Sequence, residues 1–331
     1  MFYRGILLAK KITIPVLKII VSIGLIFFLF YKLGFKNVTS QFTAINIYWF
    51  LLGIILFTLS NFLGSVQWSF LLKAVGIHLP LLRVISYYYT GLFFNNFLVG
   101  YIGGDAIRVY DITKASGSNS EAISAVFFDR LIGFAVLTIL ALLASLYLLK
   151  TFIPSNVIMI ILTIFLFWVM LIVILFNKRF LDKISWLFKW MLPETLSDKI
   201  RKIYLGINQF KNHKTILVKV FATSIIIQTL RILVHYAAAR SIGVNIAPIY
   251  FIIFIPIIAL LASLPISIGG IGIRESSGVA LFSQIWSIQA DIVAFEFFAF
   301  LIGIISTIPG GIIFMLRKEI TKPLTKGELV K

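Results

Sequence analysis

Six apolar segments of about 20 residues or more divide this sequence, at roughly 12–31, 47–72, 121–149, 154–177, 215–239 and 290–316. An α-helix rises about 1.5 Å per residue, so about 20 residues cross the hydrocarbon core of a bilayer. Lipid offers no hydrogen bonds, and a segment of this length can satisfy its own backbone there only as a helix. We therefore predict an all-α integral membrane protein, built as a polytopic helical bundle.

The charged residues are few and strongly basic. The chain has 60% hydrophobic residues, and 30 Lys and Arg against 12 Asp and Glu give a net charge of +18. The basic residues stand between apolar segments, where they favour anionic lipid and fix orientation. We expect membrane lipids, anionic or phosphate-bearing, as partners and no nucleic acid, and the sequence leaves homo-oligomer formation open. The chain has no cysteine, which excludes disulfides, thiolate metal sites and a cysteine nucleophile.

The motif Gly-Gly-x-x-Ile-Arg occurs twice, from Gly103 to Arg108 and from Gly269 to Arg274. Each copy ends a further apolar segment, at roughly 80–100 and 248–267, and each is followed by a short stretch compatible with a helix, 105–116 and 275–284. Backbone that leaves the helix at membrane depth survives only where protein or a water-filled cavity satisfies it. Two such interruptions in corresponding halves are typical of the central site of a transporter.

The positive-inside rule decides how these two segments cross. If all eight segments span the membrane, about 11 loop Lys and Arg fall inside and about 16 outside. If both Gly-Gly segments turn back, about 22 fall inside and about 5 outside. We therefore predict six spans and two Gly-rich re-entrant or broken helical hairpins, in a multi-pass protein of the cell (plasma) membrane with cytoplasmic N- and C-termini.

This topology makes the chain, 1–331, a single transmembrane domain with an inverted repeat. The first repeat covers about 47–149 and the second about 215–316, each with the order span, hairpin, span. The first span begins about 56 residues before its Gly-Gly in one repeat and about 54 in the other, as an internal repeat requires. The basic and aromatic segment 178–214 between them predicts an interfacial amphipathic linker.

The first group of ionisable residues comprises Asp105, Arg108, Asp129 and Arg130. Asp105 and Arg108 are three positions apart, on one helical face, and Asp105 stands where the helix dipole favours an anion. One interpretation is a helix cap with an Asp–Arg pair that holds the hairpin together. The other is a phosphate site, because an arginine beside free backbone N–H groups suits phosphate recognition. The sequence permits both.

The second group surrounds the second motif. Three of its four first positions are glycine, which permits a sharp turn and close approach of a ligand. Arg231 is expected either to pair with Glu296 in the last span or to contact a phosphate head group, and His235 to be a satisfied buried imidazole rather than a proton relay. Asn95 and Asn96, just before the first motif, are expected to line a hydrophilic path or to form interhelical hydrogen bonds.

The predicted set for substrate binding or translocation is drawn from both groups, and we assign no catalytic residue, metal ligand or cofactor. Its members are Asn95, Asn96, Gly103, Gly104, Asp105, Arg108, Asp129, Arg130, Arg231, Gly269, Gly270, Gly272, Arg274, Glu275 and Glu296.

Three stretches of this sequence resemble the lysylphosphatidylglycerol synthase transmembrane, or flippase-like, family. They are Gly103-Gly104-Asp105-Ala106-Ile107-Arg108, Asp129-Arg130-Leu131-Ile132-Gly133 and the run from Leu264 to Glu275. The family includes the membrane part of multiple peptide resistance factors and stand-alone relatives. The resemblance implies the lipid-translocating part without the soluble aminoacyl-transfer domain. Asp129 is a departure, since relatives often carry glutamate there.

The favoured function is a lipid translocator, flippase-like, that moves a phospholipid or lipid-linked head group through a polar cavity at the broken-helix tips. Arg108 and Arg274 would hold the phosphate there. One alternative is a membrane glycosyltransferase acting on a polyprenyl-phosphate lipid, with Asp105 or Glu275 as base; the other is a small-solute carrier. A transporter is favoured over an enzyme because the sequence has no evident nucleotide-binding loop and no extramembrane domain for a sugar nucleotide.

Overall fold

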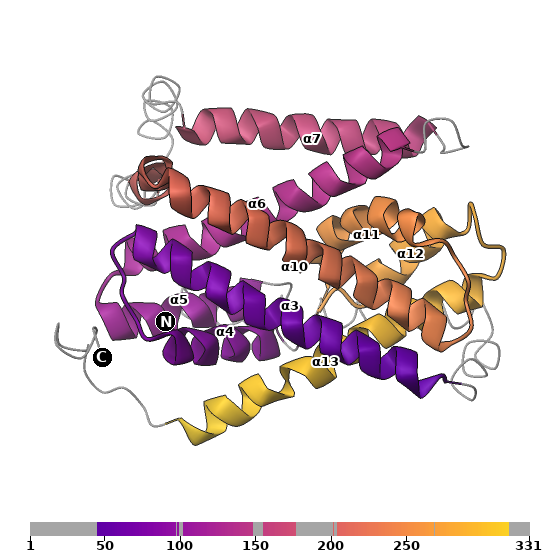
Figure 1. Ribbon diagram of the computed structural model, residues 1–331, viewed down its shortest axis with the longest axis horizontal. Coiled ribbons are helices and arrows are strands. Elements are labelled where there is room, and N and C mark those ends of the chain that lie inside the picture. The colour runs from indigo at the N-terminus through magenta and orange to yellow at the C-terminus, as the bar shows by residue number, and fades with distance from the viewer. Residues whose placement is uncertain are drawn as a thin grey trace, which may run out of the picture. The chain divides into compact units, whose positions relative to one another are not determined.

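Every described element of this protein is helical, and no strand occurs among the residues that the structure describes (Figure 1). The structure, a computed structural model, describes residues 45–96, 98, 102–147, 155–176, 201, 204–267 and 269–317. The predicted first span, 12–31, and most of the predicted linker, 178–214, lie outside these residues. The predicted all-α membrane fold is confirmed.

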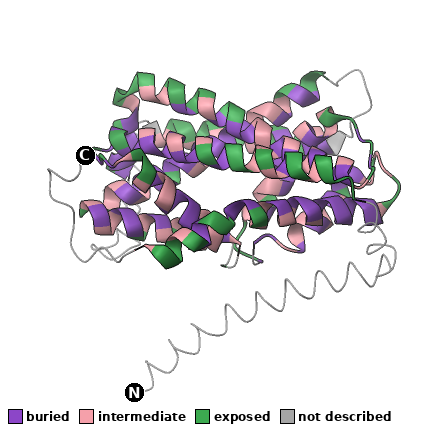
Figure 2. Ribbon diagram, turned by 60° about the horizontal axis from the view of Figure 1, so that its bottom comes forward, coloured by how far each residue is buried: buried purple, intermediate pink, exposed green. Residues whose placement is uncertain are grey.

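Five described helices are long and apolar enough to cross a membrane, and they match the predicted spans to within a few residues. They are α3 (Ile47–Ala74), α6 (Asn119–Tyr147), α7 (Ser155–Phe176), α10 (Lys214–Ser241) and α13 (Gln289–Leu316). Exposed residues run along these helices beside buried ones (Figure 2). On α3 the exposed face carries large apolar side chains such as Ile55, Leu59 and Phe62, which suits contact with lipid rather than water.

Two pairs of shorter helices follow α3 and α10. In the first half they are α4 (Leu81–Asn95) and α5 (Ile102–Ser116), and in the second half α11 (Pro248–Ser263) and α12 (Ile273–Phe282). α4 and α11 have 15 and 16 residues, so at about 1.5 Å per residue each is shorter than a hydrocarbon core of about 30 Å. Both are also shorter than the apolar segments that predicted them. The order long, short, short, long therefore occurs twice; the inversion of one half relative to the other stays a prediction.

The described residues form two compact units, each built from parts of both halves of the chain. The first unit comprises residues 45–58, 90–106 and 230–312, and the second comprises 59–89, 107–229 and 313–317. The bounds of the predicted repeats remain a prediction.

An aromatic core holds the first unit together. Phe282, the last residue of α12, lies with its ring 5.0 Å from the rings of both Phe251 and Phe254 on α11 and 5.2 Å from that of Phe295 on α13. All four rings are almost completely buried, so edge and tilted contacts add to a large apolar burial. The C-terminal end of α12 is thereby fixed, and its N-terminal end carries the second Gly-Gly motif.

The second unit has α6 as its most buried helix. Its Phe128 ring stacks on Phe210 at 4.3 Å, in the short 3-10 helix Phe210–Asn212, and its Phe134 ring lies 6.1 Å from that of Trp168 on α7. α7 itself is mostly exposed and apolar, as a helix facing lipid would be. The packing fixes α6, which carries Asp129.

Candidate functional site

The two copies of the Gly-Gly motif have different local structures. Gly103 and Gly104 lie within the first turn of α5, whereas Gly269, Gly270 and Gly272 precede α12 with φ of +58°, +75° and +82°. Only glycine adopts such φ values without strain. The sequence predicted an interrupted backbone at both motifs. The first motif itself is helical, and the break in the described residues comes before it, after Asn95.

The glycines of the first motif allow α4 and α5 to approach closely. A Cβ atom on Gly104 would lie 1.9 Å from the carbonyl oxygen of Gly91 and 2.5 Å from Oδ1 of Asn95. The same Oδ1 accepts a hydrogen bond from the backbone N–H of Gly104 at 2.9 Å. Asn95 thus satisfies one of the N–H groups that a helix start leaves unpaired. Asp105, in the same turn, is half-buried.

Arg108 belongs to a buried polar network in the second unit, the Arg108 network. Its Nη2 lies 2.9 Å from Oδ2 of Asp129 on α6, and Oδ1 of Asp129 accepts a 3.0 Å hydrogen bond from Nε2 of Gln67 on α3. The guanidinium lies over the rings of Trp68 and Tyr88, 4.1 Å and 4.5 Å from their centroids. Arg108 is 1% exposed, so its charge is compensated within the protein.

The sequence analysis singled out Arg108 and Asp129, and the structure adds Gln67, Trp68 and Tyr88 to them. Trp68 directly follows Gln67 on α3. The only hint of its role in the sequence was this position next to a polar residue of an apolar segment. Arg130, adjacent to Asp129 on α6, is half-buried. Successive residues of a helix point about 100° apart, so Arg130 faces a different direction from Asp129.

Around the second motif the first unit holds a separate set of contacts, the Gly269 turn cluster, defined by Gly269, Gly270, Gly272, Arg274 and Glu275. The N–H of Gly272 donates a 2.6 Å hydrogen bond to Oε2 of Glu275, which is 3% exposed. The Nη2 of Arg274 donates to the carbonyl oxygen of Gly269 at 3.2 Å, and its guanidinium lies 5.4 Å from the ring centroid of Phe300 on α13. Arg274 is only partly buried.

The end of α4 meets this turn. The carbonyl oxygen of Asn96 lies 3.1 Å from the place of a Cβ on Gly269, and Nδ2 of Asn96 donates a 2.7 Å hydrogen bond to Oγ1 of Thr307 on α13. Asn95 and Asn96 therefore both bond across helices, the second of the two uses expected for them. Within the first unit, residues beside the first break and residues of the second motif are brought together.

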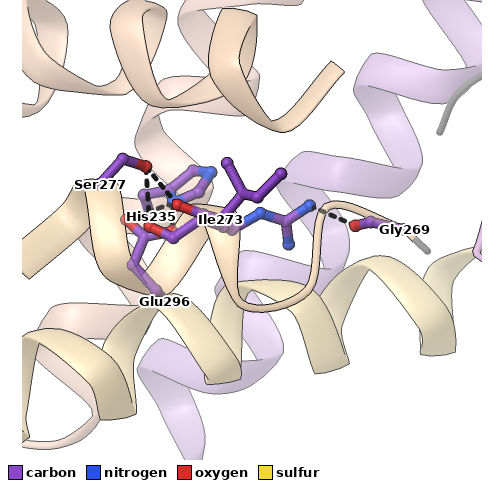
Figure 3. A network of polar contacts seen from close by, with 6 residues as sticks. His235, Gly269, Ile273, Ser277 and Glu296 are labelled. Atoms are coloured by element: carbon purple, nitrogen blue, oxygen red, sulfur yellow. Dashed lines mark hydrogen bonds and ion pairs between the residues drawn. The ribbon is translucent and has the colours of Figure 1, made fainter. Parts of the chain in front are cut away.

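Glu296 contacts His235, and no ion pair between Glu296 and Arg231 occurs among the described residues. The imidazole Nδ1 lies 3.2 Å from Oε1 and 3.1 Å from Oε2 of the carboxylate, which is fully buried on α13 (Figure 3). Arg231 and His235 are four positions apart on α10, and spacing alone places both on one face. The buried Nε of Arg231 has no hydrogen-bond partner within the described residues.

Comparison with known proteins identifies the family of this chain. The family model of the lysylphosphatidylglycerol synthase TM region matches residues 16–313. The chain belongs to this family. It is also 29% identical over 328 residues to a UPF0104 membrane protein of Pyrococcus horikoshii, covering 92% of this chain and 97% of that one. The family takes its name from a lipid-modifying synthase, and membership is consistent with a function related to membrane lipids. The chain is a multi-pass membrane protein, as predicted.

Proposed function

We propose that this protein moves a phosphate-bearing lipid or lipid-linked head group across the cell membrane, and that the Gly269 turn cluster contacts the phosphate. One observation carries the proposal: three glycines in left-handed backbone conformations stand beside a partly exposed arginine. Such backbone at membrane depth needs protein or a polar cavity around it, and broken helices of this kind surround the substrate in many carriers.

Arg274 is the side chain best suited to the phosphate. It donates to the neutral carbonyl oxygen of Gly269 at 3.2 Å, and a guanidinium bonds more strongly to a phosphate oxygen than to a neutral carbonyl. Arg274 is the second residue of α12, where the helix dipole favours an anion. The carboxylate of Glu275 already accepts a hydrogen bond from the N–H of Gly272. A phosphate would therefore be attracted by the other N–H groups at the start of α12.

Of the two roles that the sequence permits for Arg108, this proposal assigns it the structural one, in an ion pair, and not the phosphate contact. Withdrawing it from Asp129 would leave a buried carboxylate without its cation, at a cost of several kcal/mol. We assign Arg108 to positioning α5 against α3 and α6, and Arg274 to the cargo. The hydrocarbon chains of the cargo would remain in the bilayer, beside apolar surfaces such as the exposed face of α3.

The test uses purified protein in liposomes and fluorescent phospholipids with anionic, zwitterionic and lysyl-modified head groups. Lipid that reaches the outer leaflet becomes accessible to a membrane-impermeant quencher. Arg274→Gln should slow movement about tenfold or more, since one charge-assisted contact is lost, and Arg274→Lys should retain part of it. Arg240→Gln is the matched control, because Arg240 lies on α10, bonded to Asn245, outside the cluster.

Equal rates of lipid movement in wild type and Arg274→Gln would show that Arg274 does not contact the phosphate. No movement of any lipid by well-folded protein would overturn lipid translocation. The same liposomes would then be tested with polyprenyl-phosphate acceptors for glycosyl transfer and with enclosed small solutes for carrier activity.

A further inference from the structure

A buried carboxylate on the last helix of each predicted repeat bonds to the first helix of that repeat. In the first, Asp129 on α6 accepts from Gln67 on α3, 62 positions earlier. In the second, Glu296 on α13 contacts His235 on α10, 61 positions earlier. The two contacts join corresponding sequence positions of the predicted repeats, but they involve different side chains.

The carboxylate of Asp129 has partners whose charge does not change near neutral pH. Arg108 stays protonated, and the amide of Gln67 does not titrate. Glu296 has an imidazole instead, the side chain that changes charge between about pH 5 and 8. Of the two contacts, only the second contains an imidazole.

Because the contact is buried, its free energy depends strongly on how many protons the two side chains bind. The carboxylate of Glu296 is 0% exposed and the side chain of His235 is 17% exposed. Without a bound proton the pair carries one uncompensated negative charge away from water, which is costly. One proton neutralises the pair: Nδ1 is hydrogen-bonded to Oε1 at 3.2 Å, and Oε2, 3.1 Å from Nδ1, has no hydrogen-bond partner within the described residues.

The elements around the pair connect it to the Gly269 turn cluster. Cγ of Glu296 lies 3.1 Å from the place of a Cβ on Gly278, so α12 packs directly on this side chain. α12 also carries Arg274 and Glu275, the charged groups it brings to this region, and α10 brings Arg231. α3 and α11 pack on α13 through uncharged rings, at Phe298 and Phe295 respectively.

We propose that His235 and Glu296 together form a proton-binding site that takes up one proton and thereby couples a proton gradient to cargo movement. A change in the charge of Glu296, beside Gly278, would alter the packing of α12, and α12 carries Arg274 at its N-terminal end. The coupling rests on the proposed function, whereas proton binding at the pair does not, and two experiments separate them.

The first experiment measures proton binding directly. The chain has three histidines, and the other two, His78 and His213, are exposed, so ¹⁵N-histidine labelling gives three sets of imidazole resonances, two of which serve as internal references. His235→Gln identifies the third. We expect the His235 resonances to respond to pH, and this response to differ in Glu296→Gln. A resonance that does not titrate, or that titrates identically in Glu296→Gln, would overturn the site.

The second experiment imposes a pH gradient across liposomes and measures the steady-state distribution of the fluorescent lipid. One proton per cargo corresponds to about a tenfold change in distribution per pH unit. The double variant His235→Gln with Glu296→Gln should lose this response, because neither amide binds a proton. His78→Gln and His213→Gln are the matched controls and should keep it.

The outcomes distinguish the two proposals. Lipid that moves without any response to the gradient leaves translocation in place and overturns the coupling. A response that persists in the double variant His235→Gln with Glu296→Gln also overturns it. If His235 titrates with Glu296 but no lipid moves, lipid translocation fails while the proton site stands.

Discussion

Arg108 and Asp129 form a 2.9 Å ion pair with side chains only 2% and 9% exposed. Its counterpart in the second motif, Arg274, donates a hydrogen bond to a backbone carbonyl and remains partly exposed. The same six-residue motif thus serves to fasten a helix in one place and to present an arginine in the other. This difference separates the residues expected to govern stability from those expected to govern transport.

Arg108→Ala should destabilise the protein by about 3–5 kcal/mol, because it leaves the carboxylate of Asp129 buried without its cation. The double variant Arg108→Met with Asp129→Leu should be more stable than Arg108→Ala, since it removes both charges. Unfolding in detergent, followed by circular dichroism, gives the free energies. A double variant no more stable than Arg108→Ala would show that the packing over Trp68 and Tyr88 matters more than the charge.

Gly270→Ala should be more harmful than Gly243→Ala. Both glycines have left-handed φ, +75° and +82°, so both substitutions cost about 1–2 kcal/mol of backbone strain. A Cβ on Gly270 would also lie 2.9 Å from Cβ of Ala262, whereas nothing lies within 4 Å of one on Gly243. Unfolding free energies and lipid movement should be measured on both variants, and equal losses would contradict the crowding at Gly270.

Asn96→Ala and Thr307→Val should be non-additive. The hydrogen bond between these side chains joins the end of α4 to α13, and such bonds in membrane proteins are worth about 0.6 kcal/mol on average and up to about 1.7. The coupling free energy comes from a double-mutant cycle on unfolding. Ser306→Ala is the control partner for Asn96→Ala, because its hydroxyl bonds to Ile54 instead, and that pair should be additive.

Single cysteines test the predicted inversion of the repeats in this naturally cysteine-free chain. Ser116→Cys, at the end of α5, should react with an impermeant thiol reagent from the cytoplasmic side. Ser287→Cys, exposed after α12, should react from the opposite side. Labelling of both from the same side would exclude the inverted topology. Cysteine-free wild type treated with the same reagent gives the background signal.

The long helices could be predicted from the sequence because their determinant is local. α3, α10 and α13 begin at Ile47, Lys214 and Gln289, within a residue of the predicted starts, since apolar length decides where a membrane helix can lie. The ends of the short helices were less predictable. α11 ends at Ser263, before Leu264 and Pro265, although the apolar segment continues beyond it.

The partners within the sites depend on tertiary packing, which spacing does not encode. Arg231 and His235 share a face of α10, and only the depth and direction of packing against α13 show that His235 contacts Glu296. Likewise, the conformations of Gly103 and Gly269 differ although their motifs agree in sequence. One non-local signal was present: the carboxylates of Asp129 and Glu296 follow Gln67 and His235 by nearly equal distances.

The bond between Asn96 and Thr307 also sets an order of events during biosynthesis. The two residues are 211 positions apart, and a ribosome adding about 5–20 residues per second needs about 10–40 s to synthesise the intervening chain. Throughout that interval the end of α4 exists without α13. The nascent first half must therefore wait in the membrane, or in the insertion machinery, with the amide of Asn96 bound to water or to another partner until the last helix arrives.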